Sequence, residues 1–288
     1  MKNNPRRQFL LGLGALAAAS ALPGFAAAQS QLELHRPGML RIAVYADFPP
    51  YSMNGKGVEI ELGKALAARL DLLPDIVEFV ADEDMGDDLR NMVWRGHWRG
   101  TQNMGHSPAD VMLHVPVNQY FASRNSRVKI FGPYHLESMA IARNPDKVPA
   151  PHGSAVATFE PFLTEKIGAE VDTHGSDFLL HVLEGRLRQN VVHYNTIPKA
   201  VEALRQGEVG AVLSTRTQLE GALNGVDGFA IDTLNLPEMR IAAWPLGMAV
   251  RAESTELAAA LAAALEDLQR SGEVDRIFAE HGLTNRRP

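Results

Sequence analysis

The segment Trp94–Pro108 carries the side chains best suited to binding chemistry, because two Trp, two Arg and two His fall within its fifteen residues. Tryptophan together with arginine is the composition of a binding surface. Trp98 and Tyr51 can stack on a planar ring, while Arg95 or Arg99 holds its acidic groups. The alternative is a surface loop that packs on its own aromatic residues.

A second candidate binding group is Arg216, which follows the apolar run Ala211–Leu213 and the hydroxyl residues Ser214 and Thr215. A guanidinium offers a planar fork for a carboxylate or a phosphate. A carboxylate at this place would pair with the ammonium group of a ligand. The hydroxyls of Ser214 and Thr215 beside Arg216 cannot form such an ion pair. The segment therefore favours an anionic ligand. The alternative is that Arg216 is a solvated helix residue.

Three imidazoles, those of His97, His106 and His114, lie close enough in the sequence to raise the question of a metal. Their spacing matches no standard zinc signature. The acidic run Asp82–Asp88 lacks the alternation and central glycine of a calcium loop, and acids favour the N-terminus of a helix. We therefore predict no metal site and no cofactor.

The sequence also lacks the common catalytic motifs. It contains no Gly-x-Ser-x-Gly, no cysteine, no phosphate-binding loop and no His-Glu-x-x-His. No pair of carboxylates stands in an arrangement that sequence alone would assign to acid–base catalysis. We predict that the protein is not an enzyme.

Residues 1–28 have the three parts of an export signal. The pair Arg6-Arg7 precedes an uncharged run from Leu10 to Ala28, which ends in small residues. Such a segment is read by a receptor and then removed, and twin arginines indicate export after folding. We expect a mature chain that starts near Gln29 in a bacterial periplasm. The alternative is a transmembrane anchor, because the run has about the right length.

Charge and composition exclude some classes of partner. Removing a leader with three basic residues and no acid lowers the formal net charge from −6 to −9. A chain this acidic, without a basic run, is a poor candidate for nucleic acid. An exported chain without cysteine must be stable without a disulfide. The remaining length of about 260 residues fits two modest domains or one large one.

Apolar periodicity predicts alternating strands and helices, which favour a mostly parallel sheet with flanking helices. In the first part we expect strands at Leu40–Val44, Ile76–Val80 and Ala109–Val115, with helices at Val58–Leu70 and Asp87–Arg95. After Ala142 the pattern restarts. There we expect strands at Ser154–Ala157, Val191–Tyr194, Val209–Leu213, Met239–Ala243 and Leu246–Val250, and helices at Phe159–Ile167, Asp177–Arg188, Pro198–Gln206 and Ser254–Gln269.

Several strings, in this order and spacing, resemble the family 3 extracellular solute-binding proteins of ABC importers. They are Leu40–Val44 with Pro49-Pro50-Tyr51, Gly57–Leu62, Gly132-Pro133-Tyr134, Ala200–Val212 and Ser271–Ile277. The resemblance implies an α/β fold of two lobes, each a mostly parallel sheet flanked by helices. A two-segment hinge would join the lobes, which close on a ligand. We expect lobe 1 to hold residues 33–141 and 241–288, and lobe 2 residues 142–240.

Two departures from the family pattern bear on the ligand. Amino-acid-binding members use an Arg of the first lobe for the ligand carboxylate and an Asp of the second lobe for the ammonium group. Arg124 stands at the family spacing before Tyr134, with Phe121 in place of the usual Thr, but no acid follows Leu213. About ten residues are inserted within Trp94–Pro108, and such loops are uncommon without a purpose. An anionic ligand is thus a better candidate than an ordinary α-amino acid.

We predict a ligand site between the lobes formed by Asp47, Tyr51, Trp98, Arg124, Thr158 and Arg216. In this site Tyr51 stacks on the ligand and Arg124 binds its carboxylate. Thr158 supplies a hydroxyl at a helix N-terminus, where backbone amides favour anions. Arg216 closes from lobe 2.

One subgroup of the family is similar in further strings, namely Arg90–Val93, Asp110–Pro116 and Gly132–Tyr134. These strings resemble the periplasmic components associated with quinoprotein alcohol dehydrogenases, although His114 replaces a Gly of the pattern and the usual Cys of the opening strand is absent. Three functions stay open. The protein captures a small polar or anionic solute for an inner-membrane ABC permease, it is an accessory or maturation partner of a PQQ-dependent alcohol dehydrogenase or binds PQQ, or it binds an amino acid through an altered site. We expect a monomer.

Overall fold

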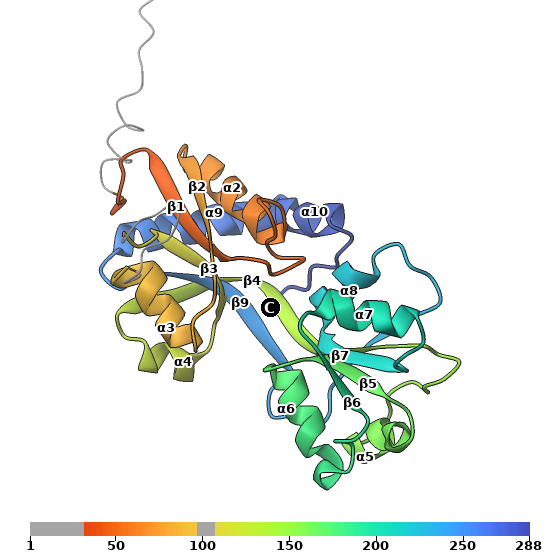
Figure 1. Cartoon of the computed structure of the whole chain (residues 1–288). Helices are drawn as coiled ribbons and strands as arrows, with labels where there is room; N and C mark the ends of the chain where they lie inside the picture. Colours follow the sequence, from red (N-terminus) through yellow and green to blue (C-terminus); the bar gives the residue numbers. More distant parts are fainter. Residues whose placement is uncertain (1–31, 97–106) are drawn as a thin grey trace, which may run out of the picture.

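The computed structural model describes residues 32–96 and 107–288 (Figure 1). The predicted signal peptide, residues 1–28, and the predicted ligand residue Trp98 lie outside the described residues. Within the described ranges, no helix is both long and apolar enough to cross a membrane.

One sheet runs through the described chain, in the order β2-β1-β3-β9-β4-β7-β5-β6, with β8 paired to β4. Its parallel parts are β2-β1-β3 at one end and β7-β5-β6 at the other. The strands β4 and β9 between them run antiparallel to each other and to their outer neighbours. The strands are β1 (Met39–Tyr45), β2 (Leu73–Phe79), β3 (Val111–Pro116), β4 (Val128–Arg143), β5 (Ile167–Glu170), β6 (Val191–Tyr194), β7 (Ala211–Thr215), β8 (Ala230–Thr233) and β9 (Ala243–Arg251).

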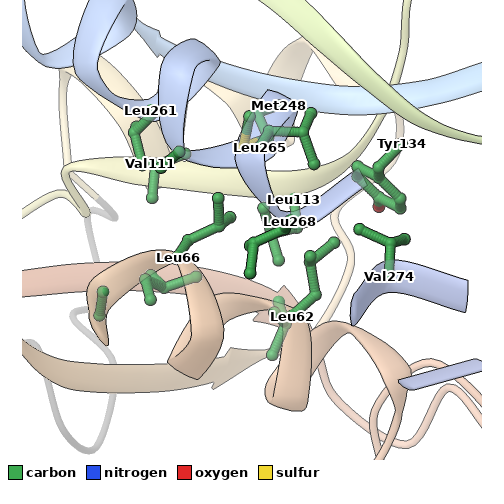
Figure 2. Close-up of a cluster of buried hydrophobic side chains, with 14 of the residues drawn as sticks. Leu62, Leu66, Val111, Leu113, Tyr134, Met248, Leu261, Leu265, Leu268 and Val274 are labelled. Carbon is green, nitrogen blue, oxygen red and sulfur yellow. The ribbon is translucent and has the colours of Figure 1, made fainter. Parts of the chain in front are cut away.

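Lobe 1 is built on the β2-β1-β3 end of the sheet. In its largest core cluster, Leu62 and Leu66 of α2 pack with Leu261 and Leu265 of α9 over the inner strands (Figure 2). The opposite face packs with α3 and the π-helical turn η1 through residues such as Leu89. The helical segments here are α2 (Val58–Arg69), α3 (Met85–Leu89), η1 (Arg90–Trp94), α4 (Gln119–Arg124), α9 (Thr255–Arg270) and α10 (Glu273–Glu280).

Lobe 2 is built on the β7-β5-β6 end and also has a core cluster on each face. Phe159, Phe162 and Leu179 belong to one cluster, and Val201 and Leu219 to the other. Strands followed by short turns and amphipathic helices produce this layering, because each helix buries one apolar stripe against the sheet. Its helical segments are α5 (Ala155–Phe159), η2 (Glu160–Leu163), α6 (His174–His181), η3 (Val182–Gly185), α7 (Ile197–Arg205) and α8 (Arg216–Leu223).

Two strands cross between the lobes. The first part of β4 pairs with β9, and its last residues, Met139–Arg143, pair with β7 and β8. Trp244, near the start of β9, packs against the cores of both lobes. The α/β architecture of two lobes is therefore as predicted. The lobe boundaries, 33–141 with 241–288 and 142–240, stay a prediction.

The structure corrects the predicted elements at the start of lobe 2. Ser154–Ala157 is not a strand, because Ser154 caps α5 by accepting a hydrogen bond from the amide of Ala157 at 3.4 Å. The strand of this region is Ile167–Glu170, where a helix was expected to end. Short apolar runs do not distinguish a buried strand from a buried helix, which explains the exchange.

Two further elements are shorter than predicted. The expected helix Asp177–Arg188 ends at His181, because Leu183 and Glu184 adopt left-handed backbone angles with φ of 50° and 57°. Met239–Ala243 does not form a strand of its own, and β9 begins only at Ala243. The helix predicted at Pro198–Gln206 is confirmed as α7, and that at Ser254–Gln269 as α9.

Candidate functional site

A hollow of about 640 Å³ lies where both lobes meet the crossing segment. Lobe 1 contributes the end of β3 and the start of α4, and lobe 2 contributes the first residue of α6. The floor is the segment that leads into β9. The lining residues are Pro116, Asn118, Tyr120, Phe121, His174, Arg240, Ile241, Ala242, Ala243, Trp244 and Pro245.

The apolar side chains of the hollow have much of their surface free. Tyr120 is 69% exposed and Ile241 is 52% exposed, which is unusual for residues of this size. Trp244 is half-buried, because its ring also contacts the two cores. An aromatic ligand would gain contact area here without displacing a core residue.

Two of the polar side chains of the hollow, His174 and Asn118, contact backbone groups. The imidazole Nε2 of His174 lies 3.2 Å from the carbonyl of Ile241, so a residue of lobe 2 contacts the crossing segment. Asn118 caps α4 by accepting a hydrogen bond from the amide of Phe121 at 3.0 Å. Arg240 is exposed and forms no ion pair within the described ranges. Among the lining residues named above there is no carboxylate.

Arg124 does not face this hollow. Its side chain is exposed and donates a hydrogen bond to the Tyr120 hydroxyl at 2.9 Å. It lines a second hollow of about 650 Å³ on lobe 1, which shares Tyr120 and Phe121 with the first. The two hollows therefore adjoin each other at α4. The role of Arg124 in binding a carboxylate stays a prediction.

Tyr51 is buried, at 1% exposure, and cannot stack on a ligand in this conformation. Its ring stacks on Phe48 with centroids 5.3 Å apart, and its hydroxyl donates to the Glu137 carboxylate. Burial and the charge of Glu137 raise the pKa of Tyr51 well above its ordinary value, so the hydroxyl stays protonated. The expected stacking residue is thus part of the contact between the lobes.

Glu137 collects hydrogen bonds from both lobes. Besides Tyr51 of lobe 1, it accepts from the amide of Thr217, in the first turn of α8, at 3.4 Å. The Thr217 hydroxyl lies 2.9 Å from His135 Nε2, and Asn285 lies 2.9 Å from the other ring nitrogen. Burial lowers the pKa of His135, so the neutral ring is favoured. We call Tyr51, Glu137, Thr217, His135 and Asn285 the hinge network.

Arg216 is occupied by partners within the chain. Its Nε donates to Glu220 at 2.7 Å, and its Nη1 donates to the carbonyl of Ile231 and to the Thr233 hydroxyl, each at 3.1 Å. Arg286 also donates to Thr233, at 3.3 Å. Burial and the neighbouring charge of Arg216 lower the pKa of Arg286. Arg216 therefore lies with the C-terminal segment and does not line the interlobe hollow.

The remaining predicted residues also lie outside the hollow. Thr158 is inside α5 and not at its start, and its hydroxyl lies 3.2 Å from the carbonyl of His152. Asp47 is exposed and has a left-handed φ of 50°. Of the described residues in the predicted site, the structure places Tyr51 and Arg216 near contacts between the lobes, where each is bonded to a partner within the chain.

Solved structures share this architecture. An ancestral cationic amino acid solute-binding protein, AncCDT-1, matches with a TM-score of 0.63 and 18% identity, over 85% of this chain and 96% of its own. The amino acid ABC transporter substrate-binding protein AbpA from Streptococcus pneumoniae, bound to L-arginine, matches with a TM-score of 0.56 and 19% identity, over 85% and 94%. The fold is that of a solute-binding protein. In another of its solved structures, AncCDT-1 is described as an ancestral amino acid-binding protein that is a precursor of cyclohexadienyl dehydratase.

No protein-family model matches the chain, and no curated protein matches it. At these identities the structural likeness establishes the solute-binding-protein fold, and it leaves the ligand to be argued from this chain's own residues.

Sequence reasoning missed the residues that line the hollow. Trp244 is the one tryptophan outside Trp94–Pro108, and it stands in the second crossing segment of the solute-binding-protein fold. His174 follows Thr173, whose hydroxyl accepts from the amide of Ser176 at 3.2 Å. A threonine cap before a helix is a readable start signal, and it would have placed His174 at the first position of α6.

A buried polar cluster beside β1 was also missed. Glu59 is fully buried, accepts from the Tyr134 hydroxyl at 2.5 Å and lies 2.7 Å from His114 Nδ1. Its Oε2 has no hydrogen-bond partner among the described residues. His114 has a left-handed φ of 62°, a conformation that favours glycine, which is the residue of the similar pattern at this place. The pairing with Glu59 offsets that backbone strain.

Proposed function

We propose that the protein is a solute-binding protein whose ligand occupies the interlobe hollow. The observation that carries the proposal is the position of this hollow, since it is lined by lobe 1, by lobe 2 and by the crossing segment together. A ligand there contacts both lobes, so its binding free energy depends on how the lobes are placed.

The lining favours a small solute with an apolar or aromatic body and a polar or anionic group. Tyr120 and Trp244 offer ring faces, and Ile241 adds aliphatic surface. Arg240 and His174 can pair with an acidic group. Because no carboxylate lines the described hollow, a ligand ammonium group has no charged partner there.

An amino acid bound through an altered site is the alternative ligand. AncCDT-1 and AbpA are named for amino-acid binding, and AbpA is bound to L-arginine. In this chain Thr215 caps α8 at the end of β7, and Arg216 beside it pairs with Glu220. This arrangement gives a cationic ligand little attraction, which is why we place it second.

We propose further that the protein works outside the inner membrane and delivers its ligand to an ABC permease. This rests on the export signal of residues 1–28 and on the fold. Association with a quinoprotein dehydrogenase, or binding of PQQ, rests on the similar strings Arg90–Val93, Asp110–Pro116 and Gly132–Tyr134 and takes second place. A binding role is preferred to catalysis, because among the described lining residues the one imidazole, that of His174, contacts the Ile241 carbonyl.

The test is a thermal-shift screen of the mature protein against amino acids, aromatic and aliphatic carboxylates, sugars and PQQ. A ligand at a hundred times its Kd adds about 2.7 kcal/mol of stability, which registers as several degrees. We expect an aromatic or anionic solute to produce the shift, and Trp244→Ala to weaken its binding at least about tenfold by calorimetry. Leu73→Ala, an exposed apolar residue outside the hollow, is the matched control. A shift with arginine alone, or one unaffected by Trp244→Ala, would contradict the proposal.

A further inference from the structure

The α4 side of lobe 1 carries two arginines, Arg124 and Arg127, for which the described part of the chain supplies no acidic partner. Arg124 is fully exposed on α4, and Arg127 follows it just before β4. Within the described ranges neither forms an ion pair with a carboxylate. Arg124 and Arg127 line the second hollow described above, which also has two acidic residues in its lining. Neither acid pairs with these arginines, since Asp84 caps α3 and Asp87 pairs with Arg90.

Each of these arginines lies over an aromatic ring. The guanidinium carbon of Arg124 is 5.7 Å from the Tyr120 ring centroid, and that of Arg127 is 5.8 Å from the Trp94 ring. Contact with a ring restrains each guanidinium. One Nη of Arg124 donates to the Tyr120 hydroxyl, and its other N–H groups remain available to a partner. A partner that binds them therefore loses less side-chain entropy than it would with two solvated lysines.

The surface around them is accessible. The helix α4 has no buried residue, Tyr120 is 69% exposed and Trp94 is 37% exposed. Exposed Trp, Tyr and Arg side chains in one patch are the composition of protein-binding hot spots. We call Trp94, Tyr120, Arg124 and Arg127 the α4 surface.

We propose that the α4 surface docks a protein segment that carries clustered carboxylates. Charge complementarity argues for this partner, because the chain as a whole has a formal net charge of −6 and would repel an acidic segment elsewhere. Each of the two arginines would donate hydrogen bonds to a carboxylate, and the rings of Trp94 and Tyr120 would cover the apolar part of the segment. This surface adjoins the interlobe hollow and shares the side chain of Tyr120 with it, but Trp94, Arg124 and Arg127 do not line that hollow.

The test uses a fluorescein-labelled peptide of ten glutamates and fluorescence anisotropy at low ionic strength. We expect the full chain to bind this probe, and R124Q/R127Q to weaken its binding at least about tenfold. Lys129→Gln removes one positive charge from an exposed residue near by that does not line the second hollow, and should change the affinity by less than about twofold. The single variants R124Q and R127Q are its charge-matched comparison. Trp94→Ala should also weaken binding, since it removes the ring under Arg127.

Three results would overturn the proposal. They are a wild-type chain that does not bind the probe, a Lys129→Gln loss equal to that of the double variant, and displacement of the peptide by free citrate at equal carboxylate concentration. The last result would identify a small-anion site in place of a protein-docking surface. Trp244→Ala separates this proposal from the proposed function, because it should lower the affinity for the solute and leave the affinity for the peptide unchanged.

Discussion

The lobes meet in two different ways on the two sides of the crossing strands. On one side of these strands lie α4 and α6 (Figure 1). They border an open hollow whose aromatic side chains have free surface. On the other side, where α8 and α10 lie, the lobes are bonded through Glu137 and by the amide of Thr284, which donates to Glu220 at 2.9 Å. The predicted ligand residues Tyr51 and Arg216 belong to this bonded side.

The difference indicates which groups are available to a ligand. A buried polar group with satisfied hydrogen bonds stabilises the fold, and a ligand could use it only by first breaking those bonds. The exposed ring of Tyr120 and the half-buried ring of Trp244 have no such buried hydrogen bonds to break. Binding should therefore depend on the open side, and stability should depend on the hinge network.

The strongest test of the bonded side is Glu137→Ala. We expect the free energy of unfolding to fall by about 3 kcal/mol, because buried donors on Tyr51 and Thr217 lose a charged acceptor. Urea denaturation followed by circular dichroism measures this loss. Glu238→Ala, at an exposed carboxylate, serves as the control. A loss below about 1 kcal/mol would show that the hinge network does not hold the lobes together.

Tyr51→Phe separates stability from ligand binding at a single atom. It removes the hydroxyl that donates to Glu137 and keeps the ring against Phe48. We expect a loss of about 2 kcal/mol in the free energy of unfolding, as for a hydrogen bond to a charged group. The Kd of the solute should not change by calorimetry. If the variant without the hydroxyl binds the solute more weakly than wild type, Tyr51 belongs to the ligand site.

Gly221→Ala probes a close contact between the lobes. A Cβ at this position would lie 2.9 Å from the Cβ of Pro50, so α8 and the loop after β1 must move apart. Helix propensity alone would stabilise the variant by about 1 kcal/mol, whereas the crowding should destabilise it by about 1 kcal/mol net. Small-angle scattering should show a larger radius of gyration. A stabilised variant of unchanged size would mean that the lobes do not press together here.

His135 should make the bonded side sensitive to pH. Burial lowers its pKa in the folded state, so below its ordinary value of 6.5 the unfolded chain binds more protons than the folded one. The stability that the neutral His135 ring contributes is fully present above pH 6.5. It is lost as the pH falls toward the lower pKa that the ring has in the folded state. In His135→Gln the slope of stability against pH between 6.5 and 5 should be flatter than in wild type. Identical slopes in the two proteins would exclude His135 as the source of this pH dependence.

Tyr120→Ala should have the smallest effect on stability. Because the ring is mostly exposed, the free energy of unfolding should change by less than about 0.5 kcal/mol. The solute should nevertheless bind about tenfold more weakly, since the ring is one wall of the hollow. Unchanged solute affinity would place the ligand elsewhere.

The sequence was sufficient for the fold wherever periodicity was strong. The helix α7, with its apolar stripe and the turn signal at Gly207, and the long helix α9 were predicted almost to the residue. The short elements between Ser154 and Leu183 were not, because four or five apolar residues fit either a strand or a helix turn and tertiary packing decides between them.

The site could be predicted less well, because it depends on partners far apart in the chain. Nothing near Tyr51 in sequence shows that its hydroxyl meets Glu137 on β4. Arg216 did carry a signal, since Glu220 stands four residues later and such pairs meet on one face of a helix. Trp244 and His174 come together only when both lobes and the crossing segment are assembled.

The most direct measurement is hydrogen–deuterium exchange of the mature protein, with and without the solute that gives the largest thermal shift. We predict slower exchange at residues 116–121, 173–176 and 240–245, which border the hollow. Residues 48–52 and 134–138 of the bonded side should exchange at an unchanged rate. Protection confined to residues 48–52 and 214–217 would contradict the account and place the ligand on the side of Tyr51 and Arg216.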